Sequence, residues 1–408
     1  MEKRRVVITG AGLTSSLGLD TGIFFDRLES GDSAVRLMTE WSEKLKINRI
    51  AAPVTLPEGL EKSIPRIFRR SMGRMSIYSA LAAEKALQTA GLSREFAASG
   101  RCACVIGSTM GSSESIMEAS RLVILNDSEN MPALQFFKCA SHSAAFNTAN
   151  FLGLTGSVLA PASACASGLQ AIGLGRDLIL SGAQDAAICG GAEEVTPEVT
   201  ASFELMFAAA KGFSGPPRYS SRPFAADRVG LVCGEGAGLV VLEEYEHAVK
   251  RSANILCEII GYATCSCGSH VSQSDHRSII RCMDLAFHDA AISPEQSDYI
   301  SAHATATIHG DAEEAMAIRE FFGSKTPVSS LKGHLGHTLG ASGAIELIAS
   351  MEMMKRGRIL PTLNLEQVAA DCAGLDHVRT VREQKINIFV KNCFAFGGIN
   401  ATLICRKI

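Results

Sequence analysis

The sequence lacks any run of about 20 uncharged apolar residues, the length that a membrane-spanning helix requires. Its N-terminal Met-Glu-Lys-Arg-Arg leads directly into a strand-like stretch, without the cleavable apolar core of a secretion signal. The net charge of -3 gives no general attraction to nucleic acid or to a membrane surface. We therefore expect a globular cytoplasmic protein with no nucleic-acid and no membrane partner.

The chain also lacks a Cys-x-x-Cys pair, although it contains 13 cysteines. Cys102 and Cys104, like Cys265 and Cys267, are separated by one residue on apolar, strand-like segments, a spacing that does not suit a structural zinc site. An odd number of cysteines with apolar neighbours is typical of reduced thiols in a reducing compartment. The sequence thus predicts neither a metal site nor a disulfide framework.

Composition and hydrophobic pattern indicate a two-part α/β protein. With 408 residues, 47% of them hydrophobic and 20% charged, the chain can bury a large core. Strand-like and helix-like patterns alternate almost throughout, which favours largely parallel sheets. After the long apolar run 229–243 the pattern restarts near Cys257, so we place the two halves at 1–253 and 254–408. We predict strands at 4–9, 102–107, 185–190, 255–263, 298–302, 386–391 and 400–406, and helices at 74–90, 165–181, 276–290, 311–322 and 340–355.

Cys165 lies in a run of small residues, Ala-Ser-Ala-Cys-Ala-Ser-Gly, between a short strand-like segment at 156–160 and a helical pattern over 168–180. The positive end of a helix favours thiolate over thiol, and small neighbours leave room for a carbonyl carbon to approach the sulfur. A free cysteine is, however, commonly a small buried hydrophobe. This position alone leaves both interpretations open.

Two further segments place a histidine after a strand-like and before a helix-like pattern, where open α/β sheets hold catalytic groups. His303 lies in the segment 301–311, and His337 lies in the segment 332–343. Each histidine, taken alone, could equally be a solvated or structurally hydrogen-bonded residue.

Together with the segment Asn-Cys-Phe-Ala-Phe-Gly-Gly-Ile-Asn at 392–400, these motifs resemble the elongating β-ketoacyl-(acyl carrier protein) synthases, the decarboxylating ketosynthases. The resemblance extends from residues 4–12 to residues 400–403. It implies a thiolase-like α/β fold, in which two related halves stack as five alternating α-β-α-β-α layers around an active site. The family usually has glycine where this chain has Ala304, and serine or asparagine where it has Cys393, which puts substrate preference in question.

The resemblance implies a catalytic set that comprises Cys165, His303, His337, Lys332 and Phe396. Cys165 would accept the acyl group, while its amide and that of Phe396 would hold the developing oxyanion. Both histidines would offer an N–H to the malonyl thioester oxygen as carbon dioxide leaves. We expect Lys332 to be a buried ammonium paired with a carboxylate, because an isolated buried charge is costly. The supporting acidic candidates are Glu314, Glu346 and Asp311.

Further positions are implied for binding. Thr305 and Thr307 would hydrogen-bond the pantetheine arm, although threonine also suits strands and turns for structural reasons. Met110 and Phe203 correspond to acyl-pocket positions and could instead be core residues, and Ser272 completes the substrate-binding candidates. The resemblance also places the docking of an acidic acyl carrier protein near a locally basic segment, for which a solvated helix start remains the alternative. That segment contains Lys62, Arg66, Arg69, Arg70 and Arg74.

The expected activity is transfer of an acyl chain to Cys165 and its decarboxylative condensation with malonyl-carrier, without a cofactor. Segments 72–76 and 394–400 look like those of aryl-polyene and related type II polyketide ketosynthases, which pair with a chain-length-factor subunit; homodimeric fatty-acid elongation is the main alternative. A non-catalytic chain-length-determining subunit would lack the nucleophile. A degradative thiolase would need a second reactive cysteine followed by glycines, and the initiating ketosynthases use asparagine in place of His337.

Overall fold

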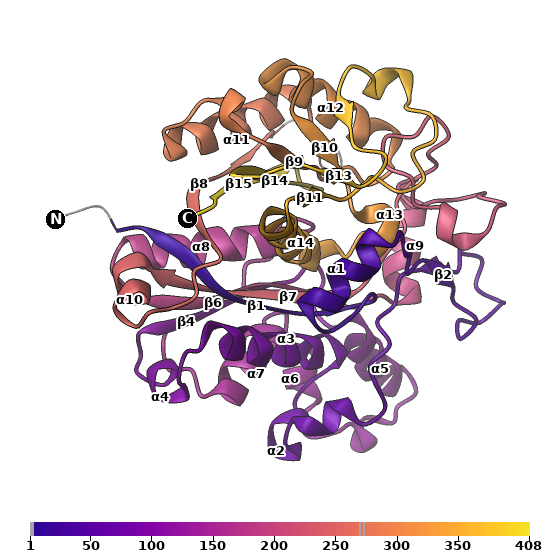
Figure 1. Ribbon diagram of the computed structural model, residues 1–408. Coiled ribbons are helices and arrows are strands. Elements are labelled where there is room, and N and C mark those ends of the chain that lie inside the picture. Colours follow the sequence, from indigo (N-terminus) through magenta and orange to yellow (C-terminus); the bar gives the residue numbers. More distant parts are fainter. Residues whose placement is uncertain (1–3, 269–270, 272–273) are drawn as a thin grey trace.

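The computed structural model describes residues 4–268, 271 and 274–408, and its helices and strands are labelled in Figure 1. The strands of the main sheet are β1 (Val6–Ser15), β4 (Cys102–Gly107), β5 (Val158–Leu159), β6 (Ala186–Glu193), β7 (Gly236–Glu244), β8 (Cys257–Ser266), β9 (Tyr299–Ser301), β10 (Pro327–Ser329), β12 (Asp376–His377), β14 (Ile388–Ala395) and β15 (Ile399–Arg406). Two short ribbons are formed by β2 (Arg36–Leu37) with β3 (Ile50–Ala51) and by β11 (Arg358–Ile359) with β13 (Arg382–Glu383).

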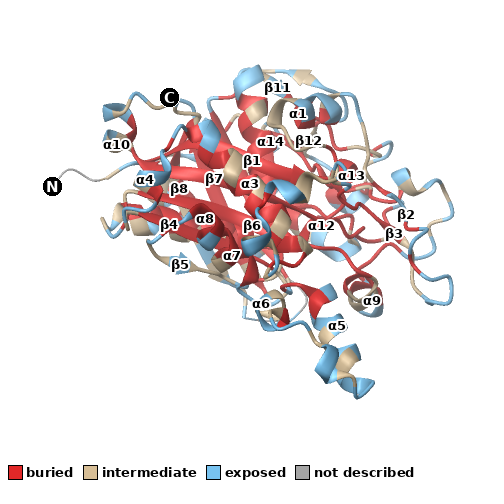
Figure 2. Cartoon of the chain, turned by 90° about the horizontal axis from the view of Figure 1, so that it is seen from below, coloured by how far each residue is buried: buried red, intermediate tan, exposed pale blue. Residues whose placement is uncertain are grey.

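The helices surround and separate the strands. They are α1 (Thr21–Glu29), α2 (Arg66–Arg69), α3 (Arg74–Ala90), α4 (Arg94–Ala97), α5 (Ser113–Ile124), α6 (Gln135–Cys139), α7 (Ser143–Leu152), α8 (Ser167–Leu180), α9 (Pro197–Leu205), α10 (Tyr245–Lys250), α11 (His276–Ala290), α12 (Ile308–Phe322), α13 (Lys332–Leu335) and α14 (Ser342–Arg356). Figure 2 shows buried residues concentrated on the strands and central helices, with exposed residues on the outer helices and loops. Of the helices in the described part of the chain, none is both long enough and apolar enough to cross a membrane.

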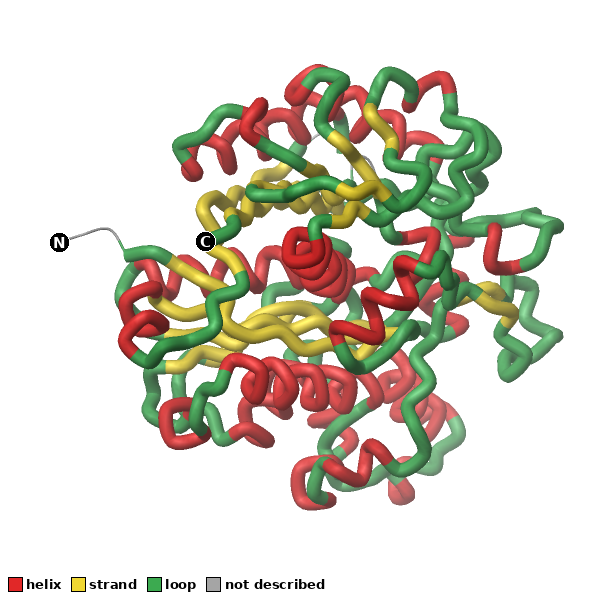
Figure 3. The backbone as a smooth tube through the Cα atoms, viewed as in Figure 1, coloured by secondary structure: helices red, strands yellow, loops and turns green. Residues whose placement is uncertain are grey.

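The main sheet has the strand order β12-β10-β9-β14-β15-β8-β1-β7-β6-β4-β5. Among the described residues, its two halves join only where Val7 and Ile8 of β1 pair with Glu258 and Cys257 of β8. Because this junction is so short, the strands separate into two stacked sheets, which Figure 3 shows above and below a central pair of helices.

The central helices are α8 and α14. Helix α8 contacts β6 and β15, and α14 contacts β7 and β14, so each touches both sheets. Helices α3 and α7 cover the outer face of one sheet, and α11 and α12 cover the outer face of the other (Figure 1). The predicted thiolase-like arrangement of five α-β-α-β-α layers is confirmed.

The strand directions differ from the expected, largely parallel arrangement. Antiparallel pairs form the middle of the sheet, from β6 through β7, β1, β8 and β15 to β14. Parallel pairs form only its two ends. Parallel neighbours require long crossover connections, whereas an antiparallel pair can be joined by a short turn. The antiparallel strands β14 and β15 are joined in this way at Phe396–Gly398. This turn lies at the edge of the active site.

The local signals that predicted individual elements are confirmed where they are strong. Helix α3, strand β4 and helix α11 have the predicted bounds, and α3 ends at Gly91, whose φ of 64° is the left-handed conformation of a helix cap.

Glycines also set the distance between layers. A Cβ on Gly10 or Gly12 of β1 would lie 2.3 Å from Ala86 O or 2.1 Å from Ala82 O, so α3 can lie directly on the strand.

The long apolar run 229–243 forms a strand only from Gly236 onward. The part of the run before Gly236 instead forms hydrogen bonds with segments of the C-terminal half. The Gly230 N–H donates to Ala306 O, and Val232 O accepts the N–H of His337. These bonds tie the two catalytic loops of the second half to the first half.

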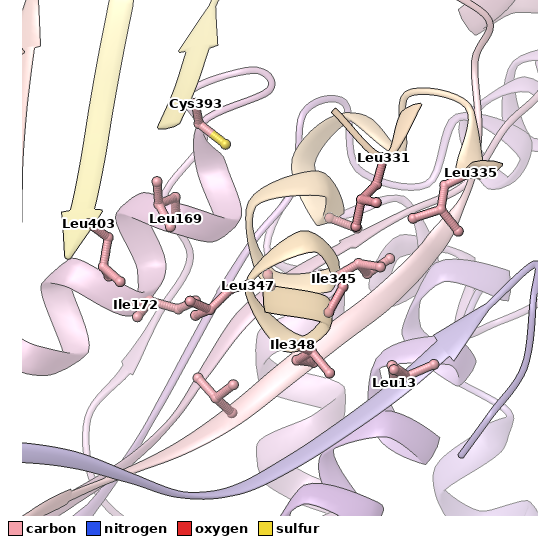
Figure 4. Close-up of a cluster of buried hydrophobic side chains, with 14 of the residues drawn as sticks. Leu13, Leu169, Ile172, Leu331, Leu335, Ile345, Leu347, Ile348, Cys393 and Leu403 are labelled. Atoms are coloured by element: carbon pink, nitrogen blue, oxygen red, sulfur yellow. The ribbon is translucent and has the colours of Figure 1, made fainter. Parts of the chain in front are cut away.

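The core is continuous through the central helical layer. Side chains of α8 and α14 project toward one another and toward both sheets in Figure 4, and they are almost fully buried. Both helices bury apolar residues on the faces that they turn to the sheets, and each also buries one charged residue, Arg176 in α8 and Glu346 in α14. The labelled members of the cluster are Leu13, Leu169, Ile172, Leu331, Leu335, Ile345, Leu347, Ile348, Cys393 and Leu403.

Candidate active site

A cavity of about 350 Å³ lies where the two halves meet. Cys165 and Phe203 line it from the first half, and His303, His337 and Phe396 line it from the second. Sequence positions more than 130 residues apart are thus brought to one concave site, as expected for the catalytic set.

Cys165 lies at the buried end of this cavity on a tight turn before α8. Ala164 has a φ of 48°, which is unusual for a residue with a side chain. The turn is held by Ser167, whose hydroxyl accepts the Ser163 N–H at 2.9 Å and donates to Ala164 O at 2.6 Å. The strained turn aims the Cys165 side chain into the cavity while leaving the residue only 5% exposed.

The protonation of this sulfur differs from the expectation based on the helix end. Burial raises the pKa of the Cys165 thiol well above its ordinary value, and the nearby Cys393 and Glu193 raise it further, against the opposing charge of Lys332. Because removal from water disfavours the charged thiolate, burial favours the protonated thiol at this position. Formation of the thiolate therefore requires a proton acceptor beside the sulfur.

His337 provides that acceptor. Its Nε2 lies 2.9 Å from Cys165 Sγ, and its backbone N–H is fixed by Val232 O at 2.6 Å. Burial, followed by the charge of Lys332, holds the pKa of His337 well below its ordinary value. The neutral imidazole can accept the thiol proton through Nε2.

His303 completes the cluster from the loop between β9 and α12. Its ring lies nearly perpendicular to that of His337, at 82°, with the ring centres 5.2 Å apart. Burial and then the charge of Lys332 also lower the pKa of His303. The ligand atoms of Cys165, His303 and His337 lie within 4.8 Å of one another, a spacing that could also hold a metal ion.

Two acidic residues on the first turns of α12 shape the His303 loop. Glu314 accepts the N–H groups of His303 and Ala304 at 2.8 and 2.6 Å, and Asp311 accepts that of Thr305 at 2.9 Å. Burial raises the pKa of Glu314 to about 7 and that of Asp311 to about 6, although these hydrogen bonds oppose the shift. The carboxylates therefore act on the backbone of the loop, and Glu314 is not the partner of Lys332.

Lys332 is completely buried and donates to Glu346 Oε1 at 2.8 Å. The same carboxylate also accepts from Lys391, a fully buried residue of β14 that the sequence analysis missed. Burial alone would raise the pKa of Glu346, but the charges of the two lysines lower it below its ordinary value. The cluster therefore holds two ammonium groups against one carboxylate, which explains its effect on both histidines. The available signal was a lysine inside a buried strand that begins with the apolar residues Ile388–Val390 and ends with Cys393–Ala395.

Phe396 lies on the turn between β14 and β15. Gly397 and Gly398 follow it with φ values of 89° and 67°, conformations that favour glycine. The Phe396 ring lies 5.8 Å from that of Phe203, centre to centre, and both side chains line the cavity. The structure thus brings the acyl-pocket candidate Phe203 and the predicted oxyanion-site residue together.

The remaining binding candidates are placed differently. Thr305 and Thr307 line the cavity, with their hydroxyls 3.1 Å apart, and Ala304 lines it as well. Met110 is 42% exposed and does not belong to the cavity lining. Ser272 lies outside the described residues.

The basic segment is not uniform. Lys62, Arg66 and Arg70 are exposed, and Arg69 pairs with Glu61 at 3.8 Å. Arg74 instead donates to Val195 O at 2.8 Å and forms ion pairs with Glu114 and Glu235. Arg74 therefore supports the interior and does not extend the exposed basic surface.

Known proteins share this architecture over its whole length. The family described as "Beta-ketoacyl synthase, N-terminal domain" matches residues 3–248, and "Beta-ketoacyl synthase, C-terminal domain" matches residues 256–366. The 3-oxoacyl-(acyl-carrier-protein) synthase 1 of Escherichia coli is 34% identical, with 99% of each chain covered.

Solved structures agree. A β-ketoacyl synthase from Burkholderia phymatum has a TM-score of 0.95 and 40% identity, covering 99% of this chain and 100% of its own. The ishigamide ketosynthase/chain length factor has a TM-score of 0.92 and 31% identity over 100% of both chains. The matches in sequence, fold and extent show that this chain belongs to the β-ketoacyl synthase family.

Proposed function

We propose that the chain is a β-ketoacyl-(acyl carrier protein) synthase in which Cys165 carries the acyl group and two neutral histidines drive condensation with malonyl-carrier. The observation that carries this proposal is the 2.9 Å contact between Cys165 Sγ and His337 Nε2 beside His303. A buried thiol, a neutral proton acceptor and a second neutral imidazole are the groups that the two half-reactions require.

In the first half-reaction, the thiol proton passes to His337 and the sulfur attacks the carbonyl carbon of the acyl-carrier thioester. A new thioester forms on Cys165, the carbon–sulfur bond to the carrier breaks, and the carrier thiol leaves with a proton. The amides of Cys165 and Phe396 are proposed to hold the oxyanion of the tetrahedral intermediate. The positive φ values of Gly397 and Gly398 support this role because they bend the chain sharply after Phe396.

In the second half-reaction, malonyl-carrier occupies the cavity and loses its carboxyl group as carbon dioxide. The electron pair moves onto the thioester oxygen, where N–H groups of His303 and His337 stabilise it, and the resulting carbanion attacks the acyl carbon on Cys165. The sulfur leaves as a thiolate, which takes up one proton from water to restore the Cys165 thiol, and the β-ketoacyl product remains on the carrier. Lys332 and Lys391 contribute by keeping both imidazoles neutral.

The test is intact-protein mass spectrometry after incubation with acyl-carrier donors of graded length and unsaturation. We expect one acyl mass on the unsubstituted chain and none on Cys165→Ala. An adduct retained on Cys165→Ala would remove the nucleophile assignment. No adduct from any donor would favour the alternative of a non-catalytic, chain-length-determining subunit.

For the pathway, we propose the aryl-polyene-like branch of type II polyketide synthesis, with primary fatty-acid elongation as the alternative. The likeness to both a 3-oxoacyl-(acyl-carrier-protein) synthase and a ketosynthase/chain length factor supports either branch. A preference for polyunsaturated or aryl donors in the same mass experiment would favour the polyene branch.

We also propose a dimer, either of two copies or with a chain-length-factor subunit. Strand β5 is an edge of the main sheet and pairs only with β4, and Val158 on it is 41% exposed. Helices α5 and α6, which contact each other, lie at the surface in Figure 2. An unpaired strand edge and exposed apolar residues are both features of subunit interfaces. The exposed apolar residues on these helices are Ile116, Met117, Val123, Ile124, Phe136 and Phe137.

The proposed division at 253/254 falls between α10 and β8, and the two family matches change over in the same region.

We further propose a cytoplasmic location, because the cysteine usage suits a reducing compartment.

A further inference from the structure

Two cysteines that the proposed mechanism does not use lie between β8 and the helix that covers it, α11 (Figure 1). Cys265 on β8 is half-buried, and Cys282 on α11 is fully buried. The Cys265 thiol donates to Ser278 O at 3.5 Å, and the Cys282 thiol donates to Ala263 O at 3.5 Å. Because each thiol bonds to the element that carries the other, both sulfur atoms lie in the gap between strand and helix.

The register between β8 and α11 brings the two thiols together. A Cβ on Gly261 would lie 2.4 Å from Ala286 O, so the helix lies directly on the strand at this point. The two thiol contacts follow at steps of two strand residues and four helix residues. Both steps advance the chain by about 6 to 7 Å, so the antiparallel elements stay in register. The Cys282 thiol is thereby placed to hydrogen-bond to the sulfur of Cys265.

The two thiols differ in their readiness to react. The hydrogen bond from Cys282 is the main cause that lowers the pKa of Cys265 to about 7, against the effect of burial. Asn400 and Arg281 lower the pKa further, and Asp275 opposes them. The bond to Cys265 and burial raise the pKa of Cys282 well above its ordinary value. An accessible thiol of low pKa reacts readily with oxidants, whereas a buried thiol of high pKa does not.

The gap between β8 and α11 lies directly behind the wall of the catalytic cavity. Cys265 pairs in register with Asn400 of β15, whose Nδ2 donates to Ser278 Oγ at 3.1 Å. Ile279, the residue after Ser278, lines the cavity together with Phe396. A disulfide brings two sulfur atoms to about 2.05 Å, much closer than a hydrogen bond does. A disulfide in this gap would therefore draw α11 toward β8 and displace the cavity wall.

We propose that Cys265 and Cys282 form a reversible disulfide in response to peroxide, and that this bond slows acyl loading in the adjacent cavity. The Cys265 thiolate attacks one oxygen of hydrogen peroxide, the oxygen–oxygen bond breaks, and the products are a sulfenic acid and hydroxide. The Cys282 thiol then attacks the sulfenic sulfur, the sulfur–oxygen bond breaks, and the products are the disulfide and water.

Hydrogen peroxide is the two-electron oxidant in this sequence, and a dithiol reduces the disulfide back to two thiols. A transient disulfide of this kind is compatible with a reducing compartment. The site itself is independent of the proposed function, because neither thiol belongs to the catalytic set.

The experiment treats the full reduced chain with increasing hydrogen peroxide, blocks the remaining thiols with N-ethylmaleimide and identifies the peptides by mass spectrometry. We expect a peptide pair linked through Cys265 and Cys282 that dithiothreitol separates. Cys139→Ser is the matched control, because Cys139 is also half-buried but burial raises its pKa. This variant should form the same linked pair, and Cys139 in the unsubstituted chain should react more slowly than Cys265.

Two substitutions of Cys282 separate its roles as hydrogen-bond donor and as disulfide partner. Cys282→Ser retains a hydroxyl donor but cannot form the disulfide, so a sulfenic acid that dimedone labels should accumulate on Cys265. Cys282→Ala also removes the donor, so alkylation of Cys265 by iodoacetamide at pH 7 should slow about threefold. The Cys265→Ser variant should leave the buried Cys282 unmodified.

The same samples report on the cavity. Acyl loading of Cys165 should fall about tenfold in the oxidised unsubstituted chain and in oxidised Cys139→Ser, and it should recover with dithiothreitol. Peroxide-treated Cys265→Ser should retain the rate of its reduced form, which shows that oxidation of Cys165 itself does not cause the loss.

Three results would overturn the inference. Equal oxidation of Cys139 and Cys265 would mean that the second thiol has no special reactivity. A disulfide from Cys265 to a different cysteine, or sulfenic acid without a disulfide in the unsubstituted chain, would reject Cys282 as its partner. Equal acyl loading before and after formation of the disulfide would reject the effect on the cavity. Failure of the reduced chain to be acylated would instead reject the proposed function, and the linked peptides would still decide the thiol pair.

Discussion

The buried end and the mouth of the cavity are constructed in opposite ways. At the buried end, Cys165, His303 and His337 are almost inaccessible, and removal of water sets the protonation state of each. At the mouth, Phe207 and Ile308 are exposed and uncharged. The difference teaches that the fold removes water from the reacting groups in advance, whereas the outer part of the same cavity keeps its apolar side chains accessible to water.

The largest effect should come from the buried charge cluster that supports the inner end. Glu346→Gln removes the only carboxylate that pairs with both Lys332 and Lys391 in the described chain, and it leaves two ammonium groups in the interior. We expect a loss of about 3 to 5 kcal/mol in the free energy of unfolding, measured by urea denaturation. The matched control is Glu383→Gln, whose side chain is 85% exposed. Equal stability of the two variants would contradict the role of the cluster.

His303→Ala should separate the two half-reactions. Loss of one preorganised donor to the developing enolate should slow malonyl decarboxylation by about 100-fold to 1,000-fold. Acyl loading should be retained, because His337 remains beside the sulfur. Release of carbon dioxide and intact protein mass measure the two steps separately. Normal condensation by both His303→Ala and His337→Ala would eliminate the proposed pair.

The pH dependence of stability should show how strongly burial acts near the inner end. Burial raises the pKa of Glu314 from 4.5 to about 7, so the folded chain retains a proton that the unfolded chain has released between those values. Stability should therefore fall as the pH rises through this window, by about 3 kcal/mol from this group. Glutamine resembles the protonated acid, so the unfolding free energies of the unsubstituted chain and Glu314→Gln should run together at low pH and diverge as the pH rises through the window. Parallel curves would show that Glu314 does not titrate there.

The smallest effect should arise at the exposed basic surface. Charge reversal at Arg66 and Arg70 should raise the KM for the carrier about threefold to fivefold at low salt and flatten its salt dependence. The Lys250→Glu variant is the control, because Lys250 is exposed on α10, away from the mouth. An unchanged KM in the double variant would remove the electrostatic contribution of this basic surface to carrier binding.

Local sequence patterns predicted much of the fold. Helix α3, strand β4 and helix α11 were located within a residue, because periodicity and a glycine stop are local signals. The layers and the proximity of the catalytic segments were predicted only through the resemblance to a family. Periodicity alone does not show that Cys165 and His337 approach within 2.9 Å across 172 positions.

Interactions that depend on the whole fold were not predictable from local sequence. The expected thiolate at Cys165 becomes a thiol because the surrounding layers exclude water. Arg74 turns inward because Glu235, 161 positions later, lies beneath it. Lys391 was missed although a lysine inside an apolar strand is a visible anomaly, since its partner Glu346 lies on a different layer.

The short junction between β1 and β8 has a consequence for how the chemistry can be monitored. With only two residue pairs linking the sheets, the packing of α8 against α14 fixes the relative position of the halves. Cys165 belongs to one half and His337 to the other, so the sulfur–nitrogen separation reports on that packing. The rate of Cys165 alkylation therefore reports on the packing of the central layer. A small void between α8 and α14 should slow this alkylation before any unfolding is measurable.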